Sequence, residues 1–182
     1  MPRLLLFAFV AIALSSSAHS GEKKDSSPVK IDNLQSQPPA DWKSEKPANR
    51  LRAYQFRLPK TKDDKEDAEL AILPNVTGTN ESNIARWKDM FLPPDGKTID
   101  EVSKVTSAKV GAAKLTTLEV SGTYLYKDRP LSAKVPVPKA NYRMLSVIFE
   151  TAEGPTLIRV IGPVTTLEHH RPGFESFLKS FK

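Results

Sequence analysis

The stretch YRMLSVIFETAEGPTLIRVI, residues 142–161, decides the fold of this chain. It holds two apolar runs, 142–150 and 156–161, which a short polar link separates. Successive side chains of an extended chain point to opposite faces, so Leu145 and Ile148 place apolar groups on both faces of the first run. Strands that are apolar on both faces are typical of the centre of a sheet. The stretch therefore predicts two neighbouring central strands joined by a hairpin-length link.

Further strands are predicted on the N-terminal side of this pair. Alternating apolar and polar residues mark four of them, at residues 52–58, 70–72, 102–110 and 114–126. Gly122 lies inside the last of these, where a glycine indicates a bulge. The segment 127–140 contains three prolines. Because proline cannot donate a ladder hydrogen bond, we expect this segment to be irregular or to form a sheet edge.

Two helices are predicted from apolar residues at helical spacing. The first is capped by Thr79 or Asn80 and has Ile84, Trp87 and Phe91 on one face.

The second predicted helix ends the chain. Thr165 and Glu168 have the spacing of a capping box at its start. Pro172 is expected to kink this helix or to divide it. Its apolar stripe consists of Phe174, Phe177, Leu178 and Phe181.

The predicted elements follow the order strands, helix, strands, helix, and several links between strands are short enough for hairpins. This order predicts the α+β class, with one antiparallel sheet and two helices packed against it. We expect a single domain over residues 41–182.

Residues 1–20 have the pattern of a signal peptide. Arg3 supplies a positive charge, residues 4–14 are apolar, and residues 18–20 offer the small side chains that a signal peptidase reads. The apolar run is shorter than the roughly 20 residues that cross a bilayer, which favours cleavage over a retained anchor. We expect an exported protein that starts near Gly21 and resides in the periplasm or outside the cell.

Residues 21–40 are polar and rich in proline, with only Val29, Ile31 and Leu34 as isolated apolar residues. Such a segment buries too little apolar surface to offset the entropy that ordering would cost. We therefore expect residues 21–40 to form a disordered tether.

The composition excludes several classes of function. The chain has no cysteine, so disulfides, thiol catalysis and cysteine zinc sites are excluded. It contains 27 basic and 21 acidic residues, and these are interleaved along the sequence. A nucleic-acid-binding protein would instead gather its lysines and arginines on one face. The net positive charge permits at most peripheral contact with anionic membrane surfaces.

Three short motifs carry a resemblance to a known family. They are Tyr54-x-Phe56-x-Leu58-Pro59, Asn83-Ile84-x-Arg86-Trp87, and Gly162-Pro163 followed by Phe177-Leu178-Lys179-Ser180-Phe181. Over about residues 42–182 the chain resembles the PsbP-like α/β sandwich, named for an extrinsic subunit of the photosynthetic water-oxidising complex, and a group of uncharacterised exported bacterial proteins. The resemblance implies a non-catalytic accessory factor that docks on a larger assembly. It carries no partner-binding or metal-binding residue over to this chain.

Histidines are the first candidates for chemistry. His19 belongs to the predicted signal peptide, which leaves the adjacent pair His169 and His170. On a helix these two side chains point about 100° apart. With Glu168 they make an incomplete ligand set, because helical metal sites use i and i+4 spacing. We expect a solvated helix end, and we predict no metal site and no cofactor.

An acidic segment offers a second candidate. It consists of Asp63, Asp64, Glu66, Asp67 and Glu69. Calcium could in principle bind there, but the spacing of an EF-hand loop with its central glycine is absent and lysines are interleaved. We expect a flexible, salt-rich loop.

No catalytic residue is predicted. The chain has no Gly-x-Ser-x-Gly motif, and no serine context suggests a partner for its histidines. Trp87 lies on the apolar helix stripe and is expected in the core. Trp42 lies at the domain edge, where a role in the core and a role in ligand binding both stay open.

The sequence thus predicts an exported, monomeric, non-catalytic interaction module, whose unknown protein partner docks on the sheet edge at residues 127–140. One alternative is a small secreted hydrolase whose residues meet only in the fold, and perturbed pKa values within a pocket would identify it. The other is a binder of anionic polymers or membrane surfaces, which needs a continuous basic patch. Its candidate residues are Lys104, Lys109, Lys114, Lys127, Arg129, Lys134 and Lys139.

Overall fold

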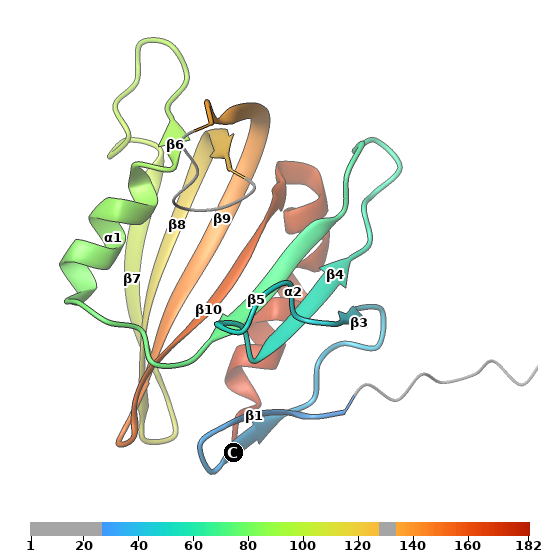
Figure 1. Cartoon of the computed structure of the whole chain (residues 1–182), viewed down its shortest axis with the longest axis vertical. Helices are drawn as coiled ribbons and strands as arrows, with labels where there is room; N and C mark the ends of the chain where they lie inside the picture. The colour runs from blue at the N-terminus through green and yellow to red at the C-terminus, as the bar shows by residue number, and fades with distance from the viewer. Residues whose placement is uncertain (1–26, 128–133) are drawn as a thin grey trace, which may run out of the picture.

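The computed structural model describes residues 27–127 and 134–182, and over these residues the fold is α+β (Figure 1). The predicted signal peptide and the first residues of the predicted tether lie outside the described residues. The elements are β1 (Val29–Ile31), β2 (Leu34–Ser36), β3 (Lys43–Glu45), β4 (Tyr54–Leu58), β5 (Ala68–Leu73), α1 (Asn80–Lys88), β6 (Phe91–Leu92), β7 (Ser103–Val110), β8 (Ala113–Tyr126), β9 (Val137–Thr151), β10 (Gly154–Pro163) and α2 (Val164–Lys179).

The large sheet has β9 and β10 at its centre, as the sequence predicts. Its strands follow the order β3-β4-β5-β10-β9-β8, and β6 and β7 both pair with the remaining side of β8. Every pairing is antiparallel. Leu157 lies opposite Ile148 and Ile158 lies opposite Val147. The two apolar strands therefore extend the core to both faces of the sheet.

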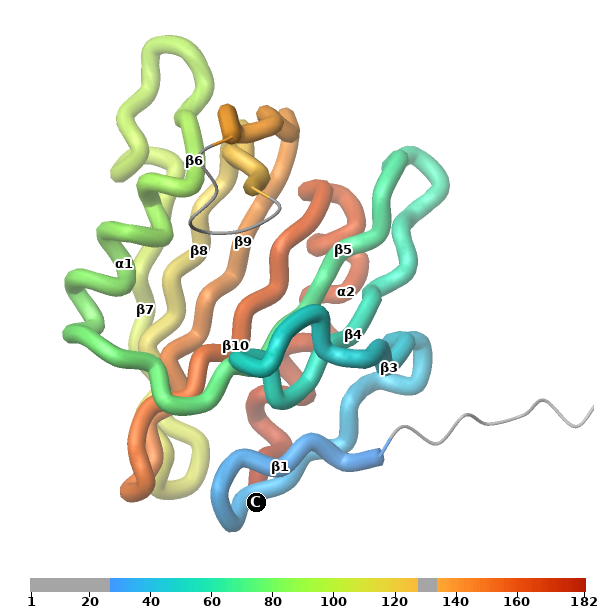
Figure 2. The backbone as a smooth tube through the Cα atoms, in the orientation of Figure 1, coloured from blue at the N-terminus to red at the C-terminus, as the bar shows by residue number. Residues whose placement is uncertain are grey.

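The helices cover opposite faces of this sheet (Figures 1 and 2). Phe177 of α2 belongs to the same apolar cluster as Val147, whereas Trp87 of α1 shares the other cluster with Ile148. Phe177 is 2% exposed and Trp87 is 3% exposed. The prediction of an antiparallel sheet with two packed helices is confirmed.

The pairing of β8 with β9 bears on two predictions. The register shifts between Gly122 and Tyr124, so the bulge lies where the glycine indicated it. Residues 137–140 form the first part of β9 and pair with β8, so they are not irregular. The pairing of β9 with β10 begins only at Tyr142, so residues 137–140 lie at an edge, which is the other form that the sequence predicts. Pro138 lies opposite Leu125 near the end of the ladder, where a missing N–H removes little pairing.

The predicted tether is ordered from its middle onward, so that prediction is wrong for residues 29–36. This segment forms a two-stranded hairpin of β1 and β2. Val29 is fully buried, and the Ser36 hydroxyl donates to the Phe177 carbonyl at 2.8 Å. Gln35 and Lys182 also exchange two backbone hydrogen bonds. The few apolar residues suffice because the end of α2 provides a surface on which they dock.

The starts of the two helices differ from each other. Thr79 caps α1 by accepting from the Ser82 amide, as predicted. The capping box of α2 is wrong, because the N-cap residue is Pro163 and makes no side-chain bond. Asp64, in the loop between β4 and β5, instead accepts from the Thr166 amide at 2.8 Å and from its hydroxyl at 2.6 Å. The helix runs on through Pro172 without division.

Candidate functional site

Asp41, His169 and His170 meet beside α2, so Asp41 takes the place that the sequence pattern suggested for Glu168. Their potential ligand atoms all lie within 4.8 Å of one another. His170 is only 5% exposed, so the expectation of a solvated helix end is wrong for this residue. The rings of His169 and His170 are 5.0 Å apart between centroids. Two adjacent helical side chains can thus converge, because the length of an imidazole side chain compensates for their divergent directions.

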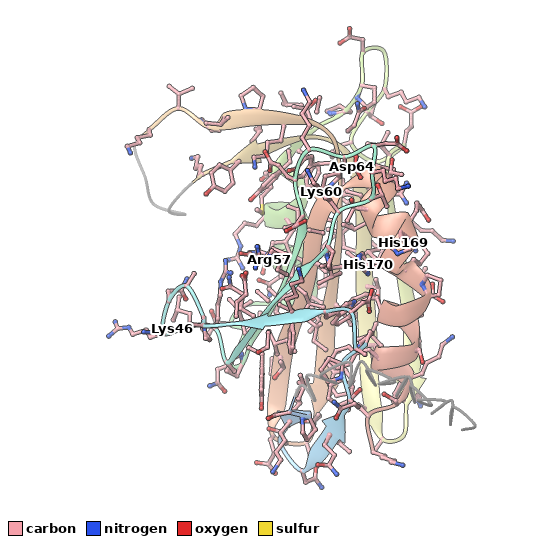
Figure 3. The ribbon with its side chains drawn as sticks, turned by 90° about the vertical axis from the view of Figure 1, so that its right-hand side faces the viewer. Lys46, Arg57, Lys60, Asp64, His169 and His170 are labelled. Atoms are coloured by element: carbon pink, nitrogen blue, oxygen red, sulfur yellow. The ribbon has the colours of Figure 1, made fainter. Side chains whose placement is uncertain are left out.

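Both ring nitrogens of His170 are held. Nε2 lies 2.9 Å from the carbonyl oxygen of Pro59, and Nδ1 lies 3.3 Å from a carboxylate oxygen of Asp41. A carbonyl oxygen only accepts, so Nε2 must carry the hydrogen of that bond. Figure 3 shows His169 and His170 on α2, below Asp64 at the upper end of the helix.

Packing on both sides fixes the loop that carries Asp41. The Trp42 amide donates to the Pro39 carbonyl at 3.1 Å. Trp42 is 3% exposed and packs its ring 5.4 Å from that of Phe177, which decides the open question in favour of the core. Gly173 of α2 faces Pro39 so closely that a Cβ there would lie 3.2 Å from the proline ring. The small glycine lets the loop approach the helix, and this approach places Asp41 beside His170.

The acidic segment does not gather into one site. Asp64 caps α2, and Asp67 accepts from the Lys60 amide at 2.8 Å. Glu69 forms an ion pair with Arg52 at 2.9 Å. Glu66 contacts a fourth set of partners, on β9. The carboxylates are therefore distributed among separate structural roles, and the calcium alternative gains no support from their positions.

Glu66 connects the loop between β4 and β5 to β9. Its carboxylate accepts from the Tyr142 hydroxyl at 2.6 Å and from the Lys139 ammonium. The hydrogen bond from Lys139, followed by that from Tyr142, lowers the pKa of Glu66. Burial, followed by the hydrogen bond to Glu66, raises the pKa of Tyr142. Lys139 also lies over the Tyr126 ring at 4.8 Å. These contacts form a structural clamp that stabilises a charged carboxylate.

A polar pair in the middle of the sheet was missed at the level of sequence. Arg159 of β10 lies opposite Ser146 of β9, and within the described residues neither side chain forms a hydrogen bond or ion pair. Burial lowers the pKa of Arg159 and raises the pKa of the nearby Tyr124. A single arginine inside the apolar run 156–161 was the available signal.

One edge of the sheet is formed by β3, and β7 lies at the opposite edge. Within the part of the chain that the structure describes, β7 pairs with β8 alone. Six of its eight residues are exposed. Lys104 and Lys109 lie on this strand, and it contains no acidic residue. A long, exposed and basic edge of this kind can accept a further strand.

The proposed basic patch is not assembled from the described lysines. Lys109 and Lys114 lie opposite each other at one end of the β7–β8 hairpin. Lys139 lies near the far end of β8, opposite Tyr124, and pairs with Glu66. Arg129 lies outside the described residues. The alternative of a binder of anionic polymers therefore gains no support from these positions.

Comparison with models of known protein families gave no match, and comparison with curated protein sequences gave none either. Among the described residues, no helix combines the length and apolar character that crossing a membrane requires.

Proposed function

We propose that this protein is an exported, non-catalytic accessory module that binds an extended acidic segment of a partner protein along the free edge of β7. The observation that carries the proposal is the exposure of this eight-residue strand, which is paired on one side only. The resemblance to PsbP-like accessory factors supports a role that depends on contact. The signal-peptide pattern of residues 1–20 supports export to the periplasm or beyond.

The backbone of β7 offers hydrogen-bonding groups to a partner strand. The Ser121 amide donates to the Val102 carbonyl at 3.1 Å, which makes this pair a hydrogen-bonded one in the antiparallel ladder. The alternation along β7 then turns the N–H and C=O groups of Val105, Ser107 and Lys109 away from β8. These groups can pair with an added strand without any change in the sheet.

The charges on β7 favour an acidic partner over a second copy of this chain. A second β7 would have to pair through the same outward groups, for example with Ser107 opposite Ser107. Each of the two strands would then carry two lysines and no acidic residue, so a second copy would add positive charge to positive charge. Glutamate or aspartate in an added strand would instead complement both lysines.

Two synthetic peptides test this proposal: one alternates valine and glutamate, and the other alternates valine and lysine. We expect the full chain to bind the glutamate peptide by fluorescence anisotropy and the lysine peptide far more weakly. Ser107→Pro removes one outward N–H while leaving the bonds to β8 intact, so it should weaken binding by about tenfold. Ser107→Ala keeps the N–H and serves as the matched control.

Three results would each overturn the proposed function: no binding of the glutamate peptide, equal binding of both peptides, or unchanged affinity of Ser107→Pro. Export is tested separately by N-terminal sequencing of protein secreted by its host. A mature start near Gly21 supports the proposal, and an intact segment 3–14 contradicts it.

A further inference from the structure

We propose that Asp41, His169 and His170 form a binding site for a divalent transition-metal ion of the zinc class. This site is independent of the β7 edge, since it lies on the opposite margin of the sheet, beside α2 and the loop before β3. The sequence pattern offered the two histidines but not Asp41, which lies in the loop before β3 and is far from them in the chain.

The hydrogen bonding of His170 prepares one ligand atom. Since Nε2 carries the hydrogen donated to Pro59, the neutral ring has its lone pair on Nδ1. Metal-binding histidines commonly donate their second ring N–H to a backbone carbonyl, which orients the ring and fixes its tautomer. The contact with Pro59 is such an orienting bond, and it comes from a different element, the loop that follows β4.

The distance between the first two ligand atoms fits a tetrahedral ion. Nδ1 of His170 and the facing oxygen of Asp41 are 3.3 Å apart. Two ligands at the usual zinc distances of about 2.0–2.1 Å from a tetrahedral centre lie about 3.4 Å from each other. Without a cation or an added proton between them, the nitrogen lone pair and the carboxylate would repel each other. A bound cation removes this repulsion.

His169 completes a set of three ligands. Its ligand nitrogen lies within 4.8 Å of the ligand atoms of both Asp41 and His170. Two imidazoles and one carboxylate are a donor set that suits zinc, and Cu²⁺ would be the strongest competitor. Asp41 and His169 are exposed, so the fourth position is open to water or to an incoming ligand. The bound ion would join the loop before β3 to the middle of α2.

Packing positions His170 and the backbone of Asp41 before the ion binds. His170 is buried, and Trp42, which follows Asp41 in the chain, is buried in the core. Gly173 permits the close approach of this loop to α2. A site whose ligands are oriented by surrounding packing loses little conformational freedom on binding.

The test uses ZnCl₂ and the full chain at a pH above the usual titration range of histidine. Isothermal titration calorimetry should show one equivalent of Zn²⁺, and the thermal midpoint should rise with added metal and fall again with a chelator. Co²⁺ in place of Zn²⁺ should give the intense visible absorption of a tetrahedral centre. Asp41→Asn and His169→Gln should each weaken Zn²⁺ binding by about tenfold or more.

Both variants keep the buried His170 ring, so they separate loss of the metal site from loss of the fold. Asp63→Asn, which removes an exposed carboxylate on another loop, is the matched control and should bind as the unaltered chain does. The metal site is wrong if no saturable binding occurs, because the contact between Asp41 and His170 then has only a structural role. It is equally wrong if Asp63→Asn weakens binding as much as Asp41→Asn. Neither result bears on peptide binding at β7.

Discussion

Two buried aromatic side chains fill the core on the two faces of the sheet. Truncation of Trp87 or Phe177 to alanine should lower the free energy of unfolding by about 3–5 kcal/mol, since each leaves a cavity that the sheet cannot close. Urea denaturation measures the loss. Tyr126→Ala is the control, because this ring is 39% exposed and its truncation should cost far less. Equal losses at all three positions would contradict the assignment of the core.

Glu66 links stability to acid pH. Its carboxylate has a lowered pKa in the folded protein, so its stabilising contribution is complete above the unfolded value of 4.5 and is lost as the pH falls through the folded value. Glu66→Gln should therefore lower stability at neutral pH and reduce the loss of stability below pH 4.5. The effect should stay below about 1 kcal/mol, because half of the side chain is exposed.

Chemical denaturation across the acid range measures this dependence. Tyr142→Phe removes one of the two donors and should reproduce part of the change. If the free energy of unfolding of Glu66→Gln falls with acid pH in parallel with that of the unaltered chain, the contacts of Glu66 contribute nothing to stability.

Among the elements, α2 depends on a cap from a distant loop. Asp64→Ala leaves the Thr166 amide and its buried hydroxyl without their acceptor, so it should cost about 1–2 kcal/mol. Thr165→Ala should change stability little, although the sequence pattern gives Thr165 the role of the cap. Thermal melts of the two variants compare them directly. A larger loss of stability in Thr165→Ala would instead support the predicted capping box.

The β1–β2 hairpin is expected to contribute to stability. Ile31→Ala removes a side chain that is 4% exposed, and we expect a loss of about 2–5 kcal/mol. Lys30→Ala changes the neighbouring exposed residue and should be nearly neutral. A hairpin that behaves as a loose tether would make the two variants indistinguishable in urea denaturation.

Local patterns predicted the elements well, and contacts between distant segments were the part that they missed. Alternation along β4 and helical spacing in α2 are properties of neighbouring residues, so they can be read directly from the sequence. Thr166 and Asp64 are 102 positions apart, and no local pattern connects them. The same holds for Asp41 and His170, whose meeting depends on how the loop before β3 packs on α2. The candidate metal site therefore became visible only in three dimensions.

Over the whole molecule, the two apolar layers share one sheet. Val147 and Ile148 are adjacent in β9, yet they belong to the clusters under α2 and α1 respectively. A change in a central strand thus affects both layers at once. With no cysteine in the chain, stability depends on this shared packing and on the contacts that close the structure near β1.

The contact between β2 and Lys182 also has a consequence for the order of events during synthesis. The β1–β2 hairpin leaves the ribosome early, whereas Phe177 and Lys182, on which it docks, are made more than a hundred residues later. Val29 and Ile31 lack the part of their apolar cluster that α2 supplies until then. A nascent chain that cannot complete its structure early remains extended for longer, and an extended chain is the form that can thread through a protein-conducting channel.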